Sequence, residues 1–383
     1  MPKIYLSCLY KYDGKSRTEL KSNQKRIKKK IISDFKNGII KWERANCRCS
    51  SNNDLVIAMK DRLGFKLRIV LCQNCGLVRA NPRISEKDIG IFYEKYYREL
   101  FSYGPNDMNE EEILSHTFKR EKERGREILN FIKKNTLLTN GVVFDFGAGT
   151  GGMLKIFKDA GFETFGVDLN MNFLNFGVNQ GLNLKKGSID ELKNYPKKAD
   201  LIIASHILEH LHRIDDCLKK IRACLKNNGY FFIELPGIFN QRDFLEFFVI
   251  EHLYYFSLLT LKKVLGENGF HLIAGNEKIR GLFQKSSQKH NLRISKEDIK
   301  DILDYFRIGD IPLPINASNL IKNKKKLKNI IIMAVVTMLY KTRIINLLAF
   351  LKDIFLNLHL NKLFIFKVLF KQLFSYSSPE LKK

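Results

Sequence analysis

The sequence predicts an α/β protein with an open, mainly parallel β-sheet and helices on both of its faces. The first observation is the stretch 142–154, where a β-branched and aromatic run leads into a glycine-rich turn and then into apolar residues at helical spacing. The second is that short apolar runs separated by helix-compatible segments continue as far as residue 285. Strands that alternate with helices in this way indicate a parallel sheet.

The glycine-rich turn and the acidic residue after the next strand indicate a nucleoside-cofactor site. Glycine lacks a Cβ atom, so it adopts positive φ angles and lets a ligand approach the start of a helix. A second apolar run, 163–167, ends at Asp168. A carboxylate at the carboxyl end of a strand can accept hydrogen bonds from both hydroxyls of a ribose.

The glycines alone fit two families of proteins. Gly147, Gly149 and Gly152 satisfy the dinucleotide pattern G-x-G-x-x-G, whereas Asp145, Gly147, Gly149 and Gly151 satisfy D-x-G-x-G-x-G. The second pattern resembles the first motif of class I S-adenosylmethionine-dependent methyltransferases, in which the acid lies under the methionine end of the cofactor. In a dinucleotide enzyme the same carboxylate would repel the pyrophosphate. We therefore favour the methyltransferase, with a dinucleotide enzyme or a non-catalytic Rossmann-like domain as the alternatives.

The segments that follow also resemble this family, and the resemblance implies a Rossmann-like seven-stranded sheet. Further strands are expected over 182–186, from 199 into the turn LEHL, over 228–236, over 270–274 and, antiparallel, over 279–284. The cofactor-binding residues expected from position and resemblance are Asp145, Gly147, Gly149, Gly151, Asp168, Ser188, Ile189 and His206.

Two histidines are the candidates for a catalytic base. Methyl transfer from a sulfonium is an in-line displacement, in which a base close to the acceptor removes its proton. The pKa of histidine suits this task near neutral pH. His210 follows the fourth strand and His252 follows the fifth, so both are expected at the rim where open α/β sheets bind ligands.

Four cysteines predict a structural zinc site. Cys47 and Cys49 are separated by a strand-forming spacer from Cys72 and Cys75, and two thiolate pairs of this kind suit tetrahedral zinc. The segment resembles the N-terminal zinc-binding segment of some bacterial sugar and surface-polysaccharide methyltransferases, which usually opens with C-x-x-C instead of C-x-C. The alternative is a set of reduced cysteines without a metal.

The pattern divides the chain into five parts. They are a basic N-terminal arm (1–45), a zinc-ribbon-like β segment (46–84), a helical connector (85–140), the methyltransferase core (141–285) and a basic, apolar helical tail (286–383). In the connector, an aromatic run at 92–97 indicates either core packing or a wall of the acceptor pocket, and the charged helix over 110–135 suits a solvent-exposed face.

The charge and the tail bear on partners and on location. The net charge of +26 fits lysine-rich surfaces or an anionic membrane better than nucleic acid, because no RNA-binding module is recognisable. The tail suits either the membrane interface or a helical partner. Without a signal-peptide pattern at its start, the chain is expected in the cytoplasm, with peripheral contact to the inner membrane face as a further expectation.

The resemblance covers residues 47–284 and implies a nucleotide-activated sugar or a glycan of surface-polysaccharide biosynthesis as the acceptor. Two alternatives stay open. One is an O-methyltransferase that acts on a quinone-like phenol, and the other is a non-catalytic scaffold that binds the cofactor and zinc at a membrane.

Overall fold

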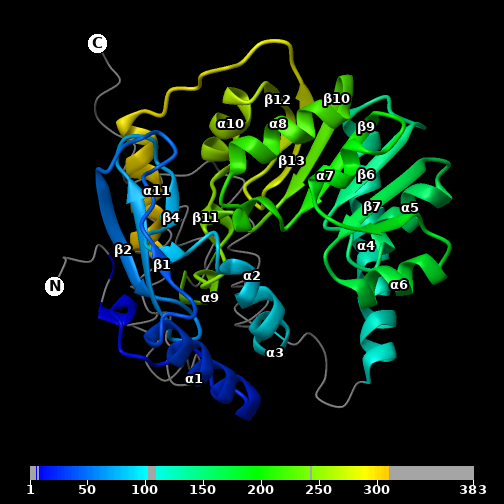
Figure 1. Ribbon diagram of the computed structural model, residues 1–383. Helices are drawn as coiled ribbons and strands as arrows, with labels where there is room; N and C mark the ends of the chain where they lie inside the picture. The colour runs from blue at the N-terminus through cyan, green and yellow to red at the C-terminus, as the bar shows by residue number, and fades with distance from the viewer. Residues whose placement is uncertain (1–5, 7, 102–108, 242–243, 310–383) are drawn as a thin grey trace, which may run out of the picture. The chain divides into compact units, whose positions relative to one another are not determined.

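The structure is a computed structural model that describes residue 6 and residues 8–101, 109–241 and 244–309 (Figure 1). Most of the predicted helical tail lies outside these residues. Within the ranges described, no helix is both long and apolar enough to cross a membrane.

The central sheet of the described residues has the seven strands that the resemblance implies. They are β6 (Val142–Phe146), β7 (Glu163–Asp168), β8 (Leu184–Lys186), β9 (Ala199–Ser205), β10 (Leu225–Glu234), β12 (Phe270–Gly275) and β13 (Arg280–Lys285). Their order is β12-β13-β10-β9-β6-β7-β8. β6 pairs parallel with β7 and β9, whereas β13 is antiparallel to β10 and β12. The predicted antiparallel last strand is confirmed.

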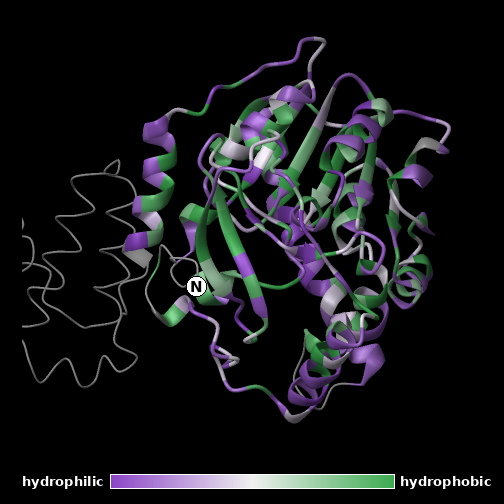
Figure 2. Ribbon diagram, turned by 60° about the vertical axis from the view of Figure 1, so that its left-hand side comes forward, coloured by the Kyte–Doolittle hydropathy of each residue, from purple (hydrophilic) through white to green (hydrophobic). Residues whose placement is uncertain are grey.

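Helices cover both faces of this sheet. They are α4 (Glu110–Asn135), α5 (Gly152–Asp159), α6 (Met171–Asn179), α7 (Ile189–Lys193), α8 (Ile214–Cys224) and α10 (Leu258–Glu267). Successive residues of a strand point to opposite faces, so Val143 packs in a core with Ile128 of α4, while Phe144 packs in another core with Leu218 of α8. The helices carry both hydrophilic and hydrophobic residues (Figure 2), as expected of amphipathic helices that cover a sheet.

A second, four-stranded sheet contains the predicted zinc-ribbon-like segment. Its strands are β2 (Asp54–Lys60), β3 (Lys66–Cys72), β4 (Val78–Ala80) and β11 (Tyr254–Tyr255), and a further pair joins β1 (Trp42–Glu43) to β5 (Arg83–Ile84). The strand β11 comes from the segment after β10 and pairs with β4 through Tyr254 and Tyr255. The N-terminal β segment and the chain that carries His252 therefore share one sheet.

The N-terminal arm and the connector pack together. Helix α1 (Ser22–Lys36) buries Ile27 and Ile31 in a core with Phe92 and Tyr96 of the connector. The aromatic run is thus mainly core, in line with one of the two sequence-based alternatives. The elements of the connector are α2 (Ile89–Phe92), a π-helical turn (Tyr93–Tyr97) and α3 (Arg98–Leu100). The remaining short elements are η1 (Cys8–Tyr10), η3 (Leu208–His210), η4 (Ile238–Asn240), α9 (Phe244–Phe247) and α11 (Lys296–Gly309).

Candidate active site

The glycine-rich turn lies between the carboxyl end of β6 and the start of α5. The amides of Gly147 and Ala148 donate to the carbonyl oxygen of Val167 at 2.9 and 3.0 Å, which fixes the turn against β7. Gly147 has a φ of 86°, and a Cβ atom there would lie 2.4 Å from the Cδ1 atom of Ile207. The turn therefore requires glycine for its own packing as well as for access of a ligand.

Asp145 presents a buried carboxylate at the base of this turn. Its side chain is fully buried, and neither oxygen has a hydrogen-bond partner among the described residues. Burial raises the pKa of Asp145 well above its usual range, and the nearby acids Glu121 and Asp168 add to the shift. A buried carboxylate without a partner is costly, and a cationic ligand would relieve that cost. The residues therefore fit the positively charged methionine end of S-adenosylmethionine.

Asp168 lies at the end of β7, where it was predicted. Its Oδ2 atom accepts from the amide of Gly149 at 2.9 Å and its Oδ1 atom from the amide of Asn170 at 2.8 Å. Each oxygen keeps a second lone pair for a ribose hydroxyl. The amide of Gly187 donates to the carbonyl oxygen of Asp168 at 2.9 Å, so the chain that carries Ser188 starts beside it.

Ser188 and Ile189 have structural partners of their own. The Ser188 hydroxyl accepts from the amide of Asp190 at 3.3 Å and caps α7, and Ile189 is buried in the core. The expectation that these two residues flank an adenine ring stays a prediction.

Glu121 on α4 is a residue of the turn that the sequence analysis missed. Its carboxylate accepts from the Thr150 hydroxyl at 2.5 Å and from the amide of Gly152 at 2.9 Å, and burial raises its pKa. The expected solvent-exposed charged face is present on α4, where Arg120 and Glu123 are exposed, but Glu121 is not part of it. Glycine at position 125, one turn further on, was an available signal, because a Cβ atom there would lie 2.9 Å from the Met153 Cα atom.

A second missed group lies at the end of β10. Glu234 accepts from Arg124 at 2.6 Å and from Arg280 at 2.8 Å, and its backbone carbonyl accepts from the His206 amide at 2.7 Å. Burial alone would raise the pKa of Glu234, but the two arginines lower it below its usual value. This group fixes the backbone of His206, which has a φ of 55° and a half-exposed side chain. Contact between His206 and the cofactor stays a prediction.

The structure brings His210 and His252 together. Their rings are 4.8 Å apart between centroids and meet edge to face. The Tyr93 hydroxyl, from the connector, is 2.8 Å from His210 Nδ1. Burial lowers the pKa of both histidines, that of His252 to about 3 with a further contribution from His210. Both rings are therefore neutral at pH 7.

Two buried glutamates flank this pair. The Glu209 Oε1 atom is 3.2 Å from His206 Nδ1 and 4.0 Å from His210 Nε2. Burial raises the pKa of Glu209, but His206 and the neighbouring histidines outweigh this and lower it to about 2. Burial instead raises the pKa of Glu251 to about 8. One carboxylate is thus a fixed negative charge and the other holds a proton.

The same three side chains are also potential metal ligands. One ligand atom each from Glu209, His210 and His252 lies within 4.8 Å of the others. The two oxygens of Glu209 differ. Oε1 contacts His206, whereas Oε2 is buried without a hydrogen-bond partner among the described residues. Because Tyr93 and the backbone of Glu251 already contact His210 Nδ1, only its Nε2 atom faces the carboxylate. This arrangement suits His210 as a base next to the negative charge of Glu209.

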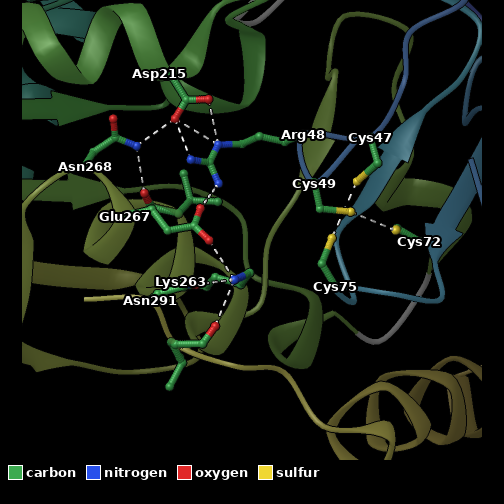
Figure 3. A network of polar contacts seen from close by, with 12 residues as sticks. Cys47, Arg48, Cys49, Cys72, Cys75, Asp215, Lys263, Glu267, Asn268 and Asn291 are labelled. Carbon is green, nitrogen blue, oxygen red and sulfur yellow. Dashed lines mark hydrogen bonds and ion pairs between the residues drawn. The ribbon is translucent and has the colours of Figure 1, made fainter. Parts of the chain in front are cut away.

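The four predicted zinc ligands also come together. The sulfur of Cys47 is 3.5 Å from that of Cys75, and the sulfur of Cys49 is 3.6 Å from that of Cys72 (Figure 3). All four sulfurs lie within 4.8 Å of one another, as tetrahedral zinc requires of thiolates about 2.3 Å from the ion. The residues fit the ion in spite of the C-x-C spacing. Cys217 and Cys224 are buried on α8.

Comparison with known proteins identifies the domain that holds Asp145, Asp168, His210 and His252. Residues 118–274 match the family model described as a methyltransferase domain. A curated relative, the C-methyltransferase NovU of Streptomyces niveus, is 26% identical over 217 residues, which are 55% of this chain and 47% of the relative. The chain therefore spans about half the length of this relative. Residues 118–274 are a methyltransferase domain.

Solved structures of methyltransferases are similar to part of the chain. Magnesium protoporphyrin IX methyltransferase from Synechocystis, with bound SAH, is 13% identical with a TM-score of 0.38 and covers 53% of this chain and 100% of its own. A SAM-dependent methyltransferase from Archaeoglobus fulgidus is 22% identical with a TM-score of 0.36 and covers 52% and 91%, respectively.

Proposed function

Because residues 118–274 are a methyltransferase domain, we propose that this protein transfers a methyl group from S-adenosylmethionine to a carbon atom of a nucleotide-activated sugar or related glycan precursor. The observation that carries the proposal is the contact between His210 and His252 next to the strand ends that hold Asp145 and Asp168. It supplies a neutral base beside the cofactor site.

The cofactor-binding residues follow from the donors and acceptors at the turn. When bound, S-adenosylmethionine supplies an electrophilic methyl group on a sulfonium. Asp145 offers its unpartnered carboxylate to the cationic end of the cofactor, and Asp168 offers lone pairs to the ribose. Gly147, Gly149 and Gly151 keep the backbone open between these two acids.

The histidine pair favours methylation at carbon. A carbon atom next to a carbonyl group becomes a nucleophile only after a base removes its proton. A hydroxyl oxygen already has a nucleophilic lone pair, so its methylation depends less on a base. His210 takes this proton, because its Nε2 atom lies 4.0 Å from the Glu209 carboxylate, whereas burial lowers the pKa of His252 to about 3 and its ring stays neutral. The negative charge of Glu209, 4.0 Å from His210 Nε2, stabilises the resulting imidazolium. The name of the curated relative, a C-methyltransferase, supports the same reaction.

The electron balance of this reaction is simple. His210 removes the proton from the acceptor carbon, and the electron pair of the C–H bond then forms the new bond to the methyl carbon. The bond between this carbon and sulfur breaks, and its electrons stay on sulfur. His210 returns its proton to solvent after the product leaves.

The cysteine group is proposed to hold a structural zinc ion. Four protein thiolates fill a tetrahedral site and leave no open position for a substrate. When bound, the ion supplies cross-linking of the two halves of the β segment.

Hydrogen exchange at the acceptor carbon tests the reaction type. The purified protein is incubated in D2O with keto-sugar nucleotides and the demethylated cofactor product. We expect deuterium at the carbon next to the carbonyl group, and C-methylated product once S-adenosylmethionine replaces the demethylated form. An O-methylated phenol as the product would favour the phenol methyltransferase, and cofactor binding without turnover on any acceptor would favour the non-catalytic scaffold.

A further inference from the structure

The residue between the two cysteines of the C-x-C pair reaches into the methyltransferase core. The Arg48 guanidinium donates from Nη2 to Asp215 Oδ1 at 2.5 Å and from Nε to Asp215 Oδ2 at 2.8 Å. Its Nη1 atom also donates to Glu267. Figure 3 shows the Arg48 side chain extended away from the sulfurs of Cys47 and Cys49, toward Asp215 and Glu267.

The contact of Arg48 with Asp215 and Glu267 is partly buried, and both carboxylates have further hydrogen-bond or ion-pair partners. The side chain of Arg48 is 17% exposed, that of Glu267 is 25% exposed and that of Asp215 is 39% exposed. Asn268 donates to Asp215 at 2.7 Å, and Lys263 pairs with Glu267 at 2.6 Å (Figure 3). A bidentate arginine–carboxylate pair is geometrically specific, so Arg48 holds a defined position relative to α8.

The cysteine loop fixes the other end of Arg48. The amide of Ser50 donates to the carbonyl oxygen of Cys47 at 2.7 Å, and Ser50 has a φ of 64°, so the loop is a tight turn. A metal ion held by Cys47 and Cys49 would immobilise the residues on both sides of Arg48. Loss of the ion would release the turn and, with it, the guanidinium.

Asp215 opens the helix that follows the catalytic histidine. It lies in the first turn of α8, five residues after His210. The end of the N-terminal β segment and the start of the connector contact the same stretch, since His212 Nε2 is 2.8 Å from the carbonyl oxygen of Ile84 and Arg213 pairs with Glu86 at 2.8 Å. The segment that carries the metal ligands therefore contacts the stretch 209–215 at Asp215 and at His212.

We propose that Arg48 is a positioning residue that couples occupancy of the cysteine metal site to the conformation of the stretch 209–215, and through it to His210. The reason for the C-x-C spacing is that the single intervening residue points out of the metal loop and into the core. Coupling of two sites is reciprocal, so breaking the contact of Arg48 with Asp215 must also weaken retention of the metal. The role of His210 as the base rests on the proposed function, but the coupling itself does not.

Metal release tests the coupling without any activity assay. The full-length, zinc-loaded protein is mixed with a chromogenic chelator, and the release rate is compared among the wild type, Arg48→Ala, Arg48→Lys and Asp215→Asn. We expect at least tenfold faster release from Arg48→Ala and from Asp215→Asn, and an intermediate rate from Arg48→Lys. The double variant Arg48→Ala/Asp215→Asn should release zinc no faster than either single variant, because both changes break the same contact. The control is Arg26→Ala, which removes an exposed arginine pair with Glu99 and should release zinc at the wild-type rate. Equal rates for all variants would overturn the proposal.

Hydrogen exchange gives the second readout. Chelation of the wild-type protein and substitution of Arg48 in the zinc-loaded protein should each raise amide exchange in 209–215 by at least tenfold, while the central strands stay protected. In the methyl-transfer assay, kcat should fall and the KM for S-adenosylmethionine should stay within twofold of wild type. If Arg48→Ala does not fold, Arg48→Lys must show the same changes in smaller measure. Unchanged exchange in 209–215 after chelation would contradict the coupling even if the proposed reaction is wrong.

Discussion

Two buried carboxylates of the candidate site, Asp145 and Glu251, both lack a full set of hydrogen-bond partners within the described part of the chain but lie at different places in the site. Each has at least one oxygen without a hydrogen-bond partner among the described residues, and burial raises the pKa of both. Asp145 lies near two further acids, whereas the backbone of Glu251 contacts His210. Neighbouring acids raise the pKa of both groups, so the two differ in position. Asp145 has no hydrogen-bond partner for either oxygen among the described residues and lies at the glycine-rich turn, where a cationic ligand can bind, whereas Glu251 lies beside the histidine pair and keeps its proton at neutral pH.

The largest effect is expected at the histidine pair. Substitution of His210 by Gln removes the proposed base and should lower kcat by ~10²–10⁴-fold, while the affinity for S-adenosylmethionine stays unchanged. His252→Gln should have a smaller effect, because its ring remains neutral. Single-turnover rates and calorimetric binding measure the two quantities. A greater loss of rate in His252→Gln would exchange the roles of the two histidines.

The next effect separates the cofactor edge from the histidine pair. Asp168→Ala removes acceptors for the ribose and should weaken cofactor binding by ~10–100-fold, which is about 1.4–2.8 kcal/mol. It also frees the amide of Gly149, so the helix content should be checked by circular dichroism. The matched control is Asp159→Ala, which removes an exposed acid of α5 that pairs with Lys155. Unchanged cofactor affinity in Asp168→Ala would refute the assignment of this edge.

A pH series compares the two buried acids directly. For Glu251, the folded pKa of about 8 exceeds the unfolded value of about 4.3, so the folded state holds an extra proton between them. The stabilising contribution is complete below the unfolded pKa, and the wild type loses it as the pH rises toward 8. Glu251→Gln has no proton to lose, so at pH 8 it should exceed the wild type by about 1–3 kcal/mol in the free energy of unfolding, with no gain at pH 4.

The same series distinguishes Asp145. The stability of Asp145→Asn relative to the wild type should also increase with rising pH, because burial likewise raises the pKa of the Asp145 carboxyl in the wild type. Unlike Glu251→Gln, it should lose cofactor affinity. Urea unfolding at pH 4 and pH 8 gives the free energies, with the exposed Glu246→Gln as the control. Equal cofactor affinity in the two variants would remove the distinction between these acids.

The cofactor edge around Asp145 and Asp168 and the pair of His210 and His252 also differ in how far their geometry could be predicted from the sequence. The cofactor edge was predictable because a strand end, a glycine turn and Asp168 follow one another along the chain, and local patterns encode them. The histidine pair could be listed but not assembled, since Tyr93, His210 and His252 come from three distant segments. The pairing of β11 with β4 was likewise invisible, because a two-residue strand has no period of its own. Glu121 was missed because charged residues surround it on a helix.

The smallest effect is expected at Glu121, and it shows how far the cofactor edge depends on support from outside the motif. Glu121→Gln keeps the shape of the side chain but replaces charge-assisted bonds to Thr150 and Gly152 by neutral ones, which should cost about 1 kcal/mol of stability. It also removes one of the acids that raise the pKa of Asp145. The carboxylate of Asp145 would then ionise more readily, so binding of a cationic cofactor should weaken by less than threefold in spite of the disturbed turn.

Calorimetry at pH 6 and pH 8 measures the affinity for the cofactor, with Glu123→Gln on an exposed position of the same helix as the control. A loss as large as that of Asp168→Ala would mean that Glu121 contacts the cofactor itself.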